Sequence, residues 1–180
     1  MAGLRKAASY SKHKVRPFTR VARGKKKAFI KVIPGNKVTK FDSGSQKDFL
    51  AGKHNFMLTC VAQQKAQVRD HALESVRAYV TKILETEMPG QYFFEIKVHP
   101  HHLIRENKAA GAVAGADRLS QGMRHSFGVV IGRAAIVHDG TDILNFSCIN
   151  EKDVRVARKA FEAIKSKLPC KAKIVFEKLE

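Results

Sequence analysis

The sequence predicts an α+β fold, in which two amphipathic helices pack on a mixed, largely antiparallel sheet. Most of the apolar segments have the composition or the alternation of strands, and only two segments repeat apolar residues at helical spacing. Strands flank both helices, and each helix needs a sheet face to cover its apolar stripe. Because 44% of the 180 residues are hydrophobic, the chain can form a substantial core.

A basic, extended arm at residues 1–27 is expected to precede a single α+β domain at residues 28–180. The arm has no apolar periodicity, and Pro17 and Gly24 favour irregular backbone. The first forty residues contain thirteen Lys and Arg and no Asp or Glu, in a chain of formal net charge +18. A solvated surface normally mixes both signs, so this stretch is predicted to bind an external polyanion, above all a nucleic acid. The candidate binding residues are Arg5, Lys6, Lys12, Lys14, Arg16, Arg20, Arg23, Lys25, Lys26, Lys27 and Lys31.

Three strands are expected at the start of the domain. Residues 28–33 (AFIKVI) and 37–41 (KVTKF) are rich in β-branched and aromatic residues, and the Pro-Gly-Asn turn at 34–36 separates them. Residues 42–45 are expected to end the second strand, and residues 54–61 alternate well enough for a third.

The first helix is expected to follow and to end at Met88-Pro89-Gly90. Its apolar stripe consists of Leu73, Val76, Val80 and Ile83, which recur every three or four residues. The opposite face, expected in solvent, carries Arg69, Asp70, Glu74, Arg77, Lys82 and Glu85.

The second half of the domain is expected to contain four strands and the second helix. Residues 92–98 are aromatic and β-branched, and residues 129–137 and 143–149 flank an Asp-Gly turn that predicts a hairpin. The second helix is expected to have Asn150 as its N-cap with Asp153 completing a capping box, and Pro169 ends it. Its apolar stripe is Val154, Ala157, Phe161, Ile164 and Leu168, and residues 172–176 form the last strand.

A long loop at residues 99–128 connects two of these strands. Its middle, residues 108–116, is nearly all Ala, Gly and Val, which predicts a mobile tip between basic shoulders. Two interpretations remain open from the residues alone: a tip that moves along a polyanion, or a surface loop without function.

No catalytic residue, metal site or cofactor is predicted. His101 and His102 are adjacent in an extended segment, so their rings should point to opposite sides, and no Cys or carboxylate partner has ligand spacing. The glycines form no nucleotide-binding motif. The three cysteines lack C-x-x-C spacing, which favours buried thiols in a reducing, intracellular compartment. No run of eighteen apolar residues is present, so a membrane is not an expected partner.

Three blocks of sequence carry a specific resemblance: HPHHLIRENK from His99, AGADRLSQGMRHSFG up to Gly128, and SKLPCKAKIVFE up to Glu177. Together with FTR at Phe18 and VRDHALESVR from Val68, they resemble the large-subunit ribosomal proteins universally numbered sixteen. The similarity is to the archaeal and eukaryotic branch, the tenth e-type protein, which is the counterpart of the bacterial sixteenth protein.

The resemblance implies an α/β-hammerhead-type fold and a place in the large subunit, at the base of the central protuberance. It implies that the long loop approaches the peptidyl/aminoacyl tRNA region and couples late subunit maturation to tRNA placement. The expected partners are large-subunit rRNA, the tRNA acceptor arm and neighbouring ribosomal proteins, with the chain a monomer within the cytoplasmic ribosome. The residues expected to face tRNA are His101, His102, Arg105, Asn107, Lys108, Gly115, Arg118 and Arg124.

The first hypothesis is therefore a structural rRNA-binding protein and not an enzyme. A free RNA chaperone or translation regulator is the alternative, since a basic arm also suits RNA off the ribosome. A nuclease is the third hypothesis, and it depends on Glu106, Asp117 or a histidine acting in catalysis.

Overall fold

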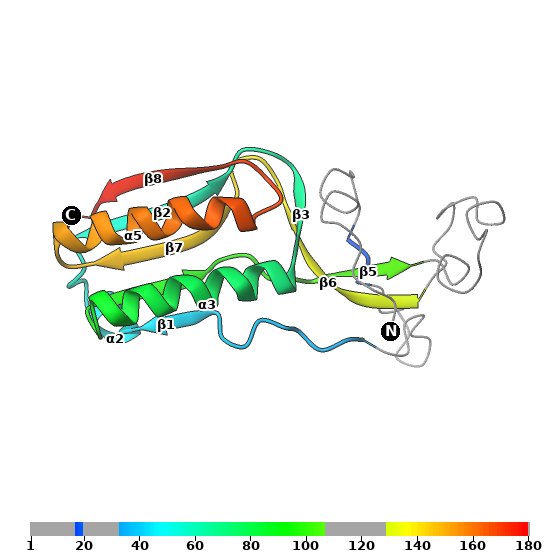
Figure 1. The fold of residues 1–180 in the computed structure, drawn as a ribbon, viewed down its shortest axis with the longest axis horizontal. Helices are drawn as coiled ribbons and strands as arrows, with labels where there is room; N and C mark the ends of the chain where they lie inside the picture. Colours follow the sequence, from blue (N-terminus) through cyan, green and yellow to red (C-terminus); the bar gives the residue numbers. More distant parts are fainter. Residues whose placement is uncertain (1–16, 20–32, 107–128, 180) are drawn as a thin grey trace.

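The computed structural model describes residues 17–19, 33–106 and 129–179 (Figure 1). Within these residues the fold is α+β, with two sheets in which every strand pair is antiparallel. The five-stranded sheet has the order β1-β4-β7-β2-β8, and its strands are β1 (Asp42–Gly44), β4 (Tyr92–Ile96), β7 (Asp142–Cys148), β2 (Phe56–Ala62) and β8 (Ala172–Lys178). The three-stranded sheet has the order β3-β6-β5, and its strands are β3 (Ala66–Arg69), β6 (Val129–Val137) and β5 (His102–Glu106).

Two long helices, α3 (Asp70–Glu87) and α5 (Glu151–Ile164), lie side by side on one face of the five-stranded sheet (Figure 1). Phe161 of α5 meets the rings of Phe94 and Phe146 edge-on, at centroid distances of 6.3 and 6.4 Å. Burying a side chain of this size stabilises the fold by roughly 1.5–3 kcal/mol. The aromatic and β-branched strands and the two apolar helix stripes predicted from the sequence thus form one core.

Both predicted long helices are confirmed, with small differences at their ends. The apolar stripe of α3 is buried as expected at Leu73, Val76 and Val80. Asn150 stands at the N-cap of α5, but its side chain donates to the Asp153 carboxylate (3.3 Å) and caps no backbone N–H. A short 3₁₀ turn (Lys165–Lys167) extends α5 towards Pro169, and a five-residue helix, α2 (Gln46–Leu50), was not predicted.

The predicted strand at residues 37–41 is wrong, and its partner at 28–33 lies almost wholly outside the described residues. Residues 37–41 are irregular, because the N–H groups of Lys37 and Thr39 are satisfied by carboxylates of α3 and not by a neighbouring strand. The strand begins one residue later, as β1, where a break was expected.

The predicted hairpin at Asp139-Gly140 is also wrong, although the turn itself forms. Gly140 has a φ of +78°, as such a turn requires, and its N–H donates to the carbonyl of Ala62 (2.9 Å). The end of β2 thus bonds to this turn, β6 continues into the three-stranded sheet, and β7 enters the five-stranded sheet. The turn is where the chain passes from one sheet to the other.

Candidate nucleic-acid interface

The structure describes the base of the predicted loop. His102 and Arg105 lie in β5, a strand within the segment expected to be loop, and His101 directly precedes it. The other predicted tRNA-facing residues lie outside the described residues: Asn107, Lys108, Gly115, Arg118 and Arg124. Every Lys and Arg of the arm that was predicted to bind rRNA, the first being Arg5 and the last Lys31, also lies outside them.

A short stretch of the arm, Pro17–Thr19, lies against the free edge of β5. The N–H of Phe18 donates to Nδ1 of His102 (2.9 Å), and the N–H of Leu103 donates to the carbonyl of Phe18 (3.1 Å). The Arg105 guanidinium sits 3.6 Å above the centre of the Phe18 ring, a cation–π contact worth roughly 0.5–2 kcal/mol. The predicted arm and the predicted loop therefore meet at β5.

His102 is a buried histidine that must be neutral to hold this contact. Its side chain is buried, whereas that of His101, which directly precedes the strand, is exposed. The pKa of His102 is lowered from 6.5 to about 4, mainly by burial and to a smaller extent by electrostatic repulsion from His101 and Arg105. Since Nδ1 accepts the Phe18 N–H, the ring proton belongs on Nε2.

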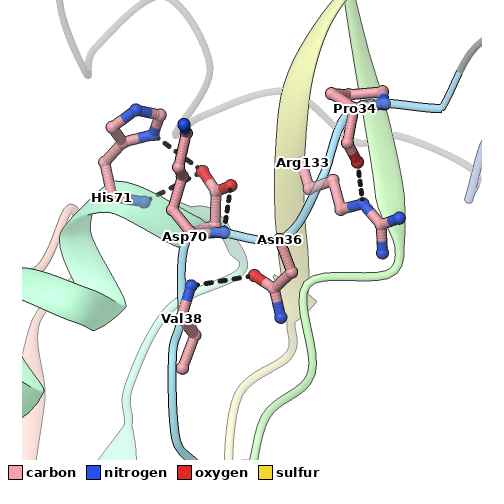
Figure 2. A network of polar contacts seen from close by, with 7 residues as sticks. Pro34, Asn36, Val38, Asp70, His71 and Arg133 are labelled. Carbon is pink, nitrogen blue, oxygen red and sulfur yellow. Dashed lines mark hydrogen bonds and ion pairs between the residues drawn. The ribbon is translucent and has the colours of Figure 1, made fainter.

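Residues 33–41 form a strap that runs from the arm to β1, and polar contacts fix it to the body (Figure 2). Arg133 of β6 donates from Nε to the carbonyl of Pro34 (2.7 Å), and the Lys37 N–H donates to the carboxylate of Asp70 (3.2 Å). The same carboxylate accepts the N–H of His71 (2.9 Å) and lies 2.8 Å from its Nδ1. The chain is therefore attached to the folded body on both sides of residues 20–32.

Asp70 corrects the sequence analysis, because it is almost fully buried and not on the solvent face of the helix. It is the first residue of α3, where an acidic side chain meets unsatisfied backbone N–H groups. Its position directly after a strand was the signal for this role. Glu74, one turn later, binds Thr39 of the strap (3.2 Å) and Arg77 (2.7 Å), and the Arg77 hydrogen bond lowers the pKa of Glu74.

The described residues carry little chemistry for catalysis. Cys60, Cys148 and Cys170 are buried thiols, as predicted. Burial raises the pKa of Cys60 to about 11 and of Cys148 to about 12, so both thiols stay protonated at neutral pH. Among residues 17–19, 33–106 and 129–179, no three His, Cys, Asp or Glu side chains are grouped to hold a metal, and no helix is long and apolar enough to span a membrane.

Acid is expected to destabilise the contact between Phe18 and β5. Below pH 6.5 an unfolded chain protonates His102, but the folded chain resists until about pH 4, so stability falls as the pH drops through this window. The loss approaches about 3 kcal/mol at and below pH 4. We expect His102→Asn, whose Oδ1 can still accept the Phe18 N–H, to lack this part of the pH dependence in urea unfolding curves.

His138→Asn is the matched control, since it removes an exposed histidine from the turn between β6 and β7. It should keep the pH dependence of the unmodified chain. Equal pH dependence of His102→Asn and the unmodified chain, or an NMR titration of His102 near 6.5, would contradict the prediction.

Comparison with known proteins gives one consistent result. A family model described as ribosomal protein L16p/L10e matches residues 11–175. The large ribosomal subunit protein uL16 of Staphylothermus marinus is 37% identical over 178 residues, which is 98% of this chain and 95% of that protein. Its namesake from Archaeoglobus fulgidus is 37% identical over 97% of this chain and 94% of its own, and that from Nanoarchaeum equitans is 36% identical over 94% and 90%.

Proposed function

The chain belongs to the ribosomal protein L16p/L10e family, and from this membership we propose that it binds rRNA at the base of the central protuberance and supports tRNA placement with its long loop. At the coarser level it is a structural constituent of the large ribosomal subunit and not an enzyme. The observation that carries the proposal is the family match over residues 11–175, which includes most of the arm and the whole loop.

We infer that the arm neutralises rRNA phosphates, mostly by releasing counterions, and that the folded body fixes where the arm begins and ends. The contacts of Phe18 with β5 and of the strap with α3 support this inference, because they hold both flanks of residues 20–32 against the body. That segment contains the predicted binding residues Arg20, Arg23, Lys25, Lys26, Lys27 and Lys31.

We infer that the loop works from a rigid base. Glu106 pairs with Val129 across β5 and β6, so both ends of residues 107–128 start from one antiparallel pair. The cations Lys108, Arg118 and Arg124 lie within that segment and suit the phosphates of a tRNA acceptor arm.

Sucrose-gradient sedimentation of a tagged chain tests the function. A ribosomal constituent sediments with large subunits in stoichiometric amount and resists moderate salt. A free RNA chaperone or translation regulator stays near the top of the gradient, and that result would replace the proposal with its alternative.

Deletion of residues 108–115 is expected to separate assembly from tRNA binding. Because the loop starts and ends at the Glu106–Val129 pair, a shorter loop can close without straining the body. We expect the shortened chain to enter large subunits, but late maturation to slow and tRNA binding at the peptidyl site to weaken several-fold in filter-binding assays.

An eight-residue Gly/Ser replacement of the same segment is the matched control, because it keeps the length and removes the sequence. If it behaves as the unmodified chain does, the loop acts by its length alone. Unchanged growth and tRNA binding after the deletion would remove the loop from the proposed function.

A further inference from the structure

A hollow of about 330 Å³ lies between α5 and β8. Figure 1 shows β8 at the edge of the five-stranded sheet, beside α5. Arg158 and Lys165 line the hollow from the helix side, and Lys173 lines it from the strand. Glu162 is the acid that lines it with them, so the hollow has an excess of positive charge.

These three cations are available to an outside partner. Arg158, Lys165 and Lys173 are exposed, and none takes part in the ion pairs found among the described residues. Although Glu162 lies nearby, a cation that is not held in an ion pair can still bind an anion such as phosphate.

An exposed aromatic ring stands on the same face of β8. Phe176 is 43% exposed, and because side chains two residues apart on a strand share a face, it lies on the same face as Ile174 of the hollow. Lys173 alternates to the other face and lines the hollow from the edge of the sheet, where β8 is the last strand. The ring of Phe176 stacks on the ring of Phe56, with the two ring centroids 5.9 Å apart and the ring planes at 22°. One face of the ring is therefore held in place by Phe56, while the side chain stays accessible to a flat partner.

We propose that the hollow between α5 and β8 binds an unpaired segment of RNA. Its phosphates contact Arg158, Lys165 and Lys173, and one base stacks on Phe176. Single-stranded nucleic acid is bound in this way elsewhere, by cations that follow the backbone and by aromatic rings under the bases. The charge favours RNA over a protein strand added to the β8 edge. This inference rests on the proposed function and adds a third RNA site to those of the arm and the loop.

The absence of Trp from the sequence allows a local test on the full chain. In Phe176→Trp, the indole is the sole strong fluorophore and reports on base stacking whether or not the arm also binds. A twenty-nucleotide oligouridylate should quench it saturably. The matched control is Tyr79→Trp, at a 38% exposed aromatic in the separate hollow between α3 and α5. Quenching of both variants alike, or of neither, overturns the proposal.

The cations are tested on the same Phe176→Trp chain. Changing Arg158, Lys165 and Lys173 to Gln should lower the slope of log affinity against log salt by about 2, from three lost phosphate contacts. The control changes Lys82, Lys152 and Lys159, which are also exposed but do not line the hollow, and should leave the slope unchanged. Equal slopes for the two triple variants contradict the proposed phosphate contacts.

The ring is tested by Phe176→Tyr and Phe176→Leu, with melting temperatures to confirm folding. Both keep apolar packing on Phe56, but only Tyr can stack on a base. We expect Leu to weaken binding of oligouridylate by about tenfold in a chain whose arm cations at residues 5–16 are neutralised, and Tyr to retain it.

Ultraviolet crosslinking of intact large subunits decides between RNA and protein. An RNA adduct on the β8 peptide supports the proposal, and a crosslink to another protein there overturns it. RNA adducts on the arm alone contradict RNA binding in the hollow but agree with the proposed function. A chain that fails to sediment with large subunits at all contradicts the proposed function itself.

Discussion

Replacing the five cations of residues 1–16 by Gln will weaken binding to large-subunit rRNA by about 10²- to 10³-fold at physiological salt. The residues are Arg5, Lys6, Lys12, Lys14 and Arg16, and no acid lies among them to take up their charge. Each lost phosphate contact removes about 0.7–0.9 from the slope of log affinity against log salt, so the slope will fall by about 4. Filter binding of an rRNA transcript between 50 and 300 mM salt, the range in which such contacts dominate, measures both quantities.

The matched control changes five exposed cations of the folded body to Gln: Lys47, Lys65, Lys82, Lys152 and Lys159. It carries the same net charge as the arm variant. If the two variants lose affinity equally, net charge and not the arm governs binding, and the proposed role of the arm fails. The anchor at Phe18 is untouched in both, so the circular dichroism spectrum should match that of the unmodified chain.

Gly44→Ala will cost about 3 kcal/mol of stability, the largest effect expected from Ala at any of the described glycines. Gly44 has a φ of +90°, and a Cβ there would stand 2.0 Å from the carbonyl oxygen of Tyr92. That carbonyl is backbone and is already bonded to the N–H of Ser45 (2.8 Å), so it cannot move aside without breaking the junction of β1 and α2. For a chain of this size we expect a drop of roughly 6–12 °C in Tm.

Two further glycines separate the causes of this loss. Gly52→Ala has a similar φ of +71° but open space at the Cβ, so it should cost about 1 kcal/mol. Gly35→Ala meets neither obstacle and should change stability by less than about 0.5 kcal/mol. A melting temperature for Gly44→Ala equal to that of Gly35→Ala would show that the Tyr92 carbonyl is not the barrier.

The sequence predicts those elements whose formation depends on local pattern. The buried stripe of α5 follows from the spacing of apolar residues, and the strand β8 follows from its composition. Both signals come from residues that are close together in the sequence. The local pattern does not predict which strands pair with each other. Residues 129–137 and 143–149 look like a hairpin because the Asp-Gly turn is local, but each pairs instead with strands that come much earlier in the chain, the nearest of them being β5, whose Glu106 pairs with Val129. The competition between those pairings is decided by the whole fold.

The candidate site was predicted in composition but not in geometry. The basic arm and the loop sequence are evident in one dimension, and the resemblance included the FTR block at Phe18. That Phe18 bonds to His102, 84 residues later, and lies under Arg105 depends on β5 being an edge strand. Asp70 shows the same limit, since a helix periodicity assigns it to solvent while the strap that covers it is distant in sequence.

The position of β2 has a consequence for the order of events during synthesis. β2 lies between β7 and β8, and Phe56 is paired with Lys178 across the second of these ladders. Until residues 172–178 have emerged, β2 exposes a row of unsatisfied backbone groups and the side of Phe56 that Phe176 later covers. A nascent chain of this kind is vulnerable to association with its neighbours on the same messenger, and a binding chaperone has its greatest value in that interval.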